Sequence, residues 1–250
     1  MLEIFKIWIS PVAELSLIIY IAWKFYTAGK LLRKDDFLIH CRLLLFSVLK
    51  NNKIANMLAS EIAVFYYVFC KTPDIDYKTR FTTYKENGII LVLYTFLFLF
   101  MIETTGMHFV LQLWNKTFAW VLTALSFYTC IQLFAHIRAL QARPVVISND
   151  RILLCSGLMG GDAIIMMDNI AKIERTSKPF PGKEAVKLAL IKGMEKHNIA
   201  IYLNEPVQVI KAFGISKTAR VLLVAIDRHQ DFASSVESHM QNNNGILISE

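Results

Sequence analysis

The sequence predicts α-helical transmembrane segments over residues 1–137, an α+β domain over residues 143–241 and a short tail over residues 242–250. In the second domain we expect a bent antiparallel β-sheet of about seven strands, capped by a C-terminal helix. Hydrophobic residues make up 55% of the 250 residues, above the share of about 45–50% in ordinary soluble domains. Nearly all of the excess lies before residue 138. Beyond residue 143, short β-branched runs alternate with turn residues, which is typical of successive strands.

The strongest hydrophobic signal is a pair of apolar runs over 89–102 and 117–136, joined by a loop expected over 106–116. A bilayer core needs roughly 20 helical residues, and each run reaches that length with its flanks. We therefore expect a transmembrane hairpin over 88–137. The alternative is a pair of buried helices in a soluble core. Basic residues flank the outer ends of the hairpin, namely Lys71, Lys78, Arg80, Lys85, Arg138 and Arg143. The positive-inside rule then places both ends, and the C-terminal domain, in the cytoplasm of a multi-pass cell-membrane protein.

Two weaker candidate spans precede the hairpin, at 4–25 and 54–70. If both crossed the membrane, a strongly basic segment between them would lie outside, against the positive-inside rule. Either only one of them spans, or the basic segment is an interfacial helix. Residues 37–69 read as one long helix with a polar stretch near its middle. The first run ends in bulky aromatic residues, so we expect it to stay on the mature protein rather than act as a signal peptide.

The second domain reads as strands punctuated by turns. The runs VVIS and RILLC flank Asn149-Asp150, and AIIMM, IAKIERT, AVKLALI, IAIYL, VQVI and RVLLVAI follow. A helix is expected over 231–241, where apolar residues recur at helical spacing behind a polar start. We expect residues 143–240 to fold without the membrane segments. The expected core comprises Ile152, Leu154, Ile165, Ile173, Leu188, Ile201, Leu223 and Phe232.

The segment RPVVISNDRILL, a glycine turn and then AIIMMDNIAKIE together resemble the opening of bacterial pleckstrin-homology-like (PH-like) domains that directly follow a transmembrane hairpin. The similarity covers roughly residues 143–240 and includes an acid and two isoleucines in a "dI..i" pattern, here Asp168, Ile170 and Ile173. The chain departs from the pattern at Met167, where a bulky aromatic residue is common. The resemblance implies a PH-like fold and a setting in the bacterial inner membrane. It implies no substrate.

Three acids lie in or beside apolar runs, and they are the candidate intramembrane sites: Glu14, Glu61 and Glu103. A carboxylate at membrane depth is costly unless it is paired, protonated or hydrated, so it marks function by default. The alternative for Glu61 and Glu103 is a position at the interface, where this cost falls away.

No constellation for catalysis, cofactor binding or a metal is apparent. The histidines lack ligand partners at helical spacing, the four cysteines form no CxxC pair, and GLMGGD lacks the Lys-Ser/Thr of a phosphate-binding loop. We therefore expect no enzyme, no cofactor and no metal. The positive charges of the second domain are spread without aromatic interleaving, so we expect no nucleic-acid partner. Three lysines near two turns, Lys178, Lys183 and Lys192, are the candidate surface-binding residues toward anionic lipid, against the alternative of solvated turns.

The predicted function is that of a non-enzymatic integral membrane protein whose cytoplasmic PH-like domain binds a partner protein or the membrane surface. The expected partners are the lipid bilayer and either another protein or further copies of the chain. A small transporter or channel subunit, regulated by the cytoplasmic domain, is the alternative.

Overall fold

A computed structural model describes residues 36–69, 79–180, 182, 184–191 and 193–246. The chain divides into two units, residues 1–59 and 60–250, and each is considered by itself. The weaker candidate span at 4–25 lies outside the described residues.

The expected long helix over 37–69 is in fact two helices, α2 (Phe37–Leu49) and α3 (Asn52–Phe69). Lys50 ends α2 in the left-handed region with φ 52°, a conformation that stops a right-handed helix. The side chain of Asn51 then accepts hydrogen bonds from two backbone N–H groups in the first turn of α3. An Asn cap of this kind starts a new helix, so the polar stretch is a break between two helices.

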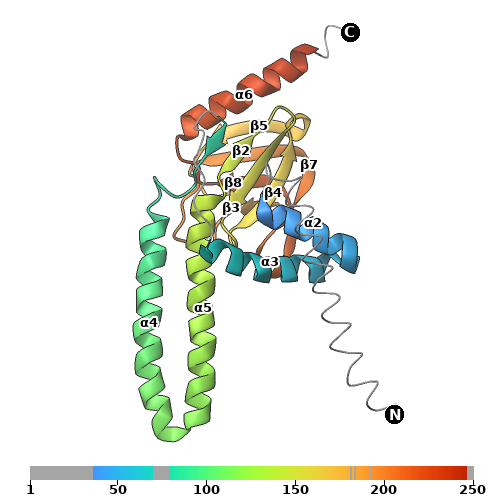
Figure 1. The fold of residues 1–250 in the computed structure, drawn as a ribbon. Coiled ribbons are helices and arrows are strands. Elements are labelled where there is room, and N and C mark those ends of the chain that lie inside the picture. Colours follow the sequence, from blue (N-terminus) through green and yellow to red (C-terminus); the bar gives the residue numbers. More distant parts are fainter. Residues whose placement is uncertain (1–35, 70–78, 181, 183, 192, 247–250) are drawn as a thin grey trace, which may run out of the picture. The chain divides into compact units, whose positions relative to one another are not determined.

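Two long helices of the second unit, α4 (Ile89–Trp114) and α5 (Lys116–Ala142), lie side by side and antiparallel (Figure 1). Among the described residues they are the two helices long and apolar enough to cross a membrane, with mean hydropathies of 2.0 and 1.6. Only 11% and 22% of their most apolar windows are buried within the chain. A core helix of a soluble protein would be mostly buried, so the exposed apolar surface favours a lipid environment.

The connection between these helices is shorter than expected. The predicted loop over 106–116 is helical as far as Trp114, and the turn is made at Asn115, whose side chain accepts from the N–H of Phe118 at 3.0 Å. The polar interruption does not break α4, and within the continuing helix the Thr105 hydroxyl donates back to the Met101 carbonyl at 2.9 Å. Threonine can satisfy its hydroxyl within a helix in this way, and apolar surroundings favour such internal bonds.

An eight-stranded sheet is formed by the described residues of the second unit, in the order β1-β2-β3-β4-β7-β8-β6, with β5 paired to β7. The sheet is mixed rather than purely antiparallel, because β6 runs parallel to β8. The strands are β1 (Arg80–Phe81), β2 (Val145–Ile147), β3 (Arg151–Ser156), β4 (Gly161–Met166), β5 (Ile170–Arg175), β6 (Ala185–Lys187), β7 (Ile199–Ile210) and β8 (Ser216–Val224), with short 3-10 turns η1 (Met167–Asn169) and η2 (Ala212–Gly214).

The long strand β7 bends the sheet. Its pairing with β8 jumps from Tyr202↔Val221 to Val207↔Ala219, so extra residues on β7 bulge out of the ladder. Pro206 lies in this bulge, where a missing backbone donor does no harm. The first part of β7 pairs with β5, whereas its far end meets β4 through Asp162↔Ile210. A bulge of this kind allows one strand to pair with different neighbours along its length.

The strand β1 comes from before the helical hairpin, so the sheet takes in chain from both sides of α4 and α5. Arg80 pairs with Val146, and Phe81 pairs with Val145. The sequence had not indicated this strand, because two residues are too short to show a period.

The C-terminal helix α6 (His229–Ile246) covers one end of the sheet (Figure 1). Its Phe232 is fully buried and meets Phe81 edge-to-face with ring centroids 5.3 Å apart. Of the expected core residues, Ile173 is half-buried and Leu223 belongs to a smaller cluster beside Ala200 and Val221. The other six lie in the main core, as predicted: Ile152, Leu154, Ile165, Leu188, Ile201 and Phe232.

Candidate functional site: the junction of hairpin and sheet

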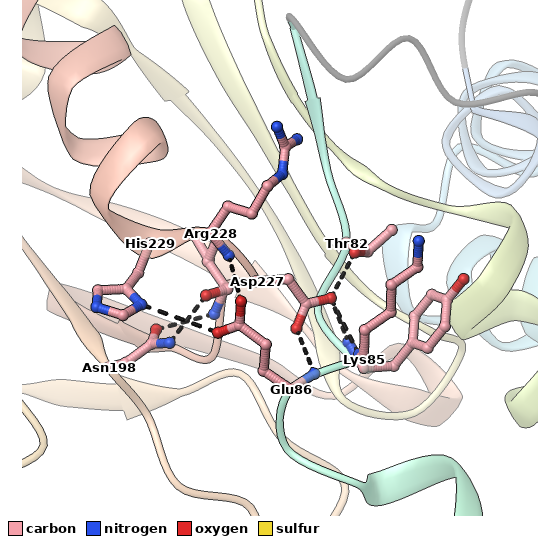
Figure 2. Close-up of polar contacts among 9 residues, drawn as sticks. Thr82, Lys85, Glu86, Asn198, Asp227, Arg228 and His229 are labelled. Carbon is pink, nitrogen blue, oxygen red and sulfur yellow. Dashed lines mark hydrogen bonds and ion pairs between the residues drawn. The ribbon is translucent and has the colours of Figure 1, made fainter.

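The N-terminal end of the hairpin is held by Asp227, which follows β8. Its carboxylate accepts backbone N–H bonds from Tyr84 at 3.2 Å, Lys85 at 3.0 Å and Glu86 at 2.9 Å, and it also accepts from the Thr82 hydroxyl (Figure 2). The Asp227 N–H donates in turn to the Thr82 carbonyl at 2.8 Å. A buried carboxylate with several charge-assisted bonds is a strong attachment. We call residues 82–86 together with Asp227 the Asp227 clamp.

The Glu86 side chain extends this clamp toward the start of α6. It accepts the backbone N–H of Arg228 at 2.9 Å and lies 3.9 Å from Nδ1 of His229 (Figure 2). Asn198, at the start of β7, donates to the Ile226 carbonyl at 2.8 Å and accepts the Ile226 N–H at 2.9 Å. One polar network therefore joins the segment before α4 to β7, β8 and α6.

The C-terminal end of the hairpin is held by Arg143, which ends α5 and is fully buried. Its guanidinium lies 3.0 Å from the Asp162 carboxylate on β4, and it donates to the Gly157 carbonyl in the turn between β3 and β4. The guanidinium also lies 6.0 Å from the ring centre of Tyr67 on α3. We call Arg143 with Asp162 and Gly157 the Arg143 clamp.

His136, six residues before the last residue of α5, reinforces this clamp. Its Nδ1 accepts the backbone N–H groups of Leu158 and Met159 at 3.1 and 3.2 Å. Gly157 adopts φ +59°, and a Cβ there would lie 2.5 Å from the His136 ring. Only glycine permits the turn to approach the helix this closely.

Between the two clamps, the turns of the hairpin nearest the sheet pack on the loop after β6. Buried residues of α4 and α5 form a cluster against which Leu190 and Ile191, from the loop after β6, are packed. The members from the helices are Ile89, Leu93, Leu133, Ile137 and Leu140. The sheet therefore contacts apolar turns of the helices themselves as well as the segments at their ends.

The same loop holds a buried carboxylate, Glu195, whose Oε1 accepts the N–H of Ile191 at 2.8 Å. Burial raises the pKa of Glu195, and this outweighs the opposite effects of its backbone hydrogen bonds and of Lys187 and Lys211. Burial likewise lowers the pKa of Lys187. The Lys211 Nζ donates to the Lys187 carbonyl at 3.0 Å, which joins the β7–β8 turn to this loop.

The contacts at the junction are hydrogen bonds, ion pairs and apolar packing. The clamp side chains are engaged with backbone groups or with each other, and no group of three potential metal ligands occurs in the described part of the chain. The contacts at the junction fix both ends of the hairpin to the sheet.

Two of the candidate intramembrane acids, Glu61 and Glu103, lie on different helices of the described part of the chain. Glu61, on α3, accepts a hydrogen bond from the Tyr128 hydroxyl on α5. Glu103 is exposed on α4, within the helix rather than in a loop. Glu14 lies outside the described residues.

A further polar group inside the hairpin was not expected. His108 of α4 lies 2.6 Å from the Thr123 hydroxyl of α5 through Nδ1 and 2.5 Å from the Gln112 amide through Nε2. The Trp120 ring meets the imidazole edge-to-face at 4.8 Å. These residues stand near the turn at Asn115.

Of the candidate surface-binding lysines, Lys183 and Lys192 lie outside the described residues. Lys178 is exposed in the loop after β5, and its carbonyl accepts from Nε2 of His197 at 3.0 Å.

Sequence reasoning missed the clamp residues. Asp227 directly follows an apolar strand and precedes a helix, a position at which an acid is typical of a cap. Its partners are backbone groups 141 to 143 residues earlier, and no local pattern indicates such a partner.

Comparison with known proteins finds no matching family model, curated protein or solved structure.

Proposed function

We propose that this chain is a non-enzymatic integral membrane protein whose cytoplasmic PH-like domain binds the membrane surface. The observation that carries this proposal is the double attachment of the hairpin, by the Asp227 clamp at one end and the Arg143 clamp at the other. A domain joined to its anchor by a flexible linker has no fixed orientation toward it. A domain clamped at both ends keeps one face toward the bilayer.

The packing of Leu190 and Ile191 supports the same proposal. These residues pack against a cluster that contains Leu93 and Leu133, which belong to the apolar helices themselves. Leu93 is four residues beyond the start of α4, about 6 Å along the helix at 1.5 Å per residue. If the hairpin spans as proposed, this packing puts the loop after β6 at the level of the membrane interface.

The PH-like part of the proposal is supported by the bent, largely antiparallel sheet and by the C-terminal helix at its end. The cytoplasmic orientation is supported by the basic residues at both outer ends of the hairpin, among them Arg80, Lys85, Arg138 and Arg143.

Site-directed labelling tests the topology. Cysteines placed at Asn115, in the turn of the hairpin, and at Ser238, on the exposed side of α6, are treated with a membrane-impermeant maleimide in intact cells. We expect labelling of the Asn115→Cys protein from outside and labelling of the Ser238→Cys protein only after permeabilisation. The reverse pattern, or equal labelling of both, would refute the orientation.

Surface binding is tested on the full chain in lipid nanodiscs. A fluorophore at Ser238→Cys reports its height above acceptor dyes on lipid headgroups. We expect one narrow distance distribution, and a broader one when Asp227→Ala is combined with Arg143→Met. A broad distribution in the parent protein would show that the domain is not held at the surface.

A second candidate, a small transporter or channel subunit, draws support from the His108, Gln112 and Thr123 group inside the hairpin and from the Glu61–Tyr128 bond. Polar groups within a span often mark a pathway for ions or protons. The two apolar helices in the described part of the chain enclose no pore by themselves, so this function requires several copies. A monomer in detergent and in nanodiscs would exclude it.

A further inference from the structure

The β7–β8 turn presents two bulky apolar side chains to the surface, although it could have been built from polar residues. Phe213 is 48% exposed and Ile215 is 57% exposed. Phe213 adopts φ 55° and ψ 24°, a region that is unfavourable for an aromatic residue and that Asn or Gly enters more readily. Gly214, the next residue, is buried, whereas the aromatic ring of Phe213 is exposed. The stability of the fold does not explain why an exposed phenylalanine occupies this left-handed position.

The turn lies at the end of the domain that meets the hairpin. Lys211, at its base, donates to the Lys187 carbonyl and lies beside Gly161, whose added Cβ would be 3.4 Å from Lys211 Cγ. Gly161 begins β4 next to Asp162 of the Arg143 clamp. Lys187 leads into the loop whose Leu190 and Ile191 pack on the helices. The turn and the loop are therefore neighbours on the side of the sheet from which the apolar helices leave.

That loop carries a third exposed apolar residue, Met194, which is 53% exposed. The exposed charges in the two segments that carry these residues are positive. Lys217 and Lys196 are exposed, the segment 211–217 contains no acid, and the one acid of the segment 193–197, Glu195, is buried. Apolar side chains bordered by lysines suit the boundary between acyl chains and anionic headgroups.

We propose that Phe213, Ile215 and Met194 form a membrane-insertion surface that enters the bilayer spanned by the hairpin, with Lys217 and Lys196 at the level of anionic lipid headgroups. This inference rests on the proposed function, since it requires the hairpin to span. Beyond the proposed function, this inference names the residues that enter the lipid and predicts a preference for anionic lipids. A bilayer is the favoured occupant because the three apolar side chains are exposed, have lysines near them in sequence, and belong to a turn and a loop that lie next to the residues packed on the apolar helices.

Fluorescence quenching on the full chain tests the insertion. The Ile215→Cys and Ser238→Cys proteins are labelled with NBD and placed in nanodiscs of phosphatidylcholine, with or without phosphatidylglycerol. The parent protein, treated in parallel, gives the background from native cysteines, of which Cys41, Cys130 and Cys155 are buried. Quenchers are iodide in water and a nitroxide near the top of the lipid acyl chain.

We expect the probe at position 215 to emit at shorter wavelength, to be quenched by the nitroxide lipid and to resist iodide, more so when phosphatidylglycerol is present. The probe at position 238 should show the opposite preference in both lipids. Iodide quenching at 215 equal to that at 238 would overturn the inference. So would protection from both quenchers, because a second protein would then cover the surface.

A second variant separates insertion from folding. Phe213→Asn combined with Ile215→Asn should leave the unfolding temperature in detergent at or above that of the parent, while the NBD probe at Met194→Cys becomes accessible to iodide. An unchanged probe would contradict the inference. If the Asn115 labelling fails as well, the proposed function fails. If Asn115 labels from outside but position 215 stays in water, only the insertion fails.

Discussion

The carboxylate of Asp227 accepts the backbone N–H of Glu86 at 2.9 Å, across 141 residues of sequence that include the whole helical hairpin. This bond and its neighbours make the start of the hairpin part of the sheet domain. Arg143 does the same for the end of the hairpin.

Replacement of Asp227 by alanine should lower the free energy of unfolding by about 3 kcal/mol, because three backbone donors and a hydroxyl lose a buried charged acceptor. Thermal unfolding in detergent measures the change. Asp231→Asn is the matched control, since its ion pair with Arg228 at 3.6 Å is partly exposed and should contribute less than about 1 kcal/mol. Equal effects of the two variants would contradict the role of the Asp227 clamp.

Replacing only one member of the Arg143–Asp162 pair should lower the free energy of unfolding strongly. Arg143→Met leaves a buried carboxylate without its cation and should destabilise by about 3–5 kcal/mol. The double variant Arg143→Met with Asp162→Leu removes both charges, so it should lose less than the sum of the single variants. Denaturant unfolding of all four proteins gives the coupling energy. Additive losses would mean that the two side chains do not act as a pair.

Phe213→Asn should leave the protein unchanged in detergent or stabilise it by about 1 kcal/mol, because asparagine tolerates the left-handed backbone better. Ala212→Asn provides a control, since Ala212 has ordinary backbone geometry and should gain nothing. A marked loss of stability in Phe213→Asn would show that the ring contributes to folding.

The buried Glu195 should make stability fall as pH rises. Burial raises the pKa of this carboxyl in the folded chain, whereas in the unfolded chain it is about 4.3. Between these two pKa values the folded state binds the proton of Glu195 more firmly than the unfolded state does. The contribution of protonated Glu195 to the free energy of unfolding is therefore complete below about pH 4.3 and is lost as pH rises through the folded pKa. Glu195→Gln removes this dependence.

The measurement is the difference in unfolding temperature between the parent and Glu195→Gln from pH 4 to pH 8. The variant should gain relative to the parent as pH increases. Burial also lowers the pKa of His197, which acts in both proteins and cancels in the difference. A constant difference would mean that Glu195 does not titrate differently on folding.

The sheet domain should need the chain before the hairpin. A piece spanning 143–241 lacks Phe81, which packs on Phe232, and it lacks the donors that surround Asp227. We expect it to unfold at a lower temperature than a version in which residues 79–88 are joined to residue 143 by a short Gly/Ser linker. Equal melting temperatures would show that β1 and the clamp contribute nothing to the domain.

The two apolar helices, the change to strands after residue 143 and the closing helix were predictable, because each rests on a local period or on composition. Most of the expected core was also predictable, since alternation along a strand indicates which side chains face inward. The break at Lys50 and the continuity of α4 through Thr105 were missed. In both segments, polar side chains such as Asn51 and Thr105 can bond to the backbone either in a helix or at a break, and local sequence does not decide between the two.

The sequence by itself therefore determined the class of protein: apolar helices of membrane length followed by a strand-rich domain. Only the tertiary structure decided that a strand from before the hairpin completes the sheet, and that Asp227 and Arg143 fix both ends of α4 and α5 to it. It also left the apolar side chains of Phe213, Ile215 and Met194 exposed. The physical reason is the separation along the sequence over which each kind of interaction acts. Hydrophobic patterns act within one helix or strand, whereas a buried charge is satisfied by whichever donors the folded chain brings to it.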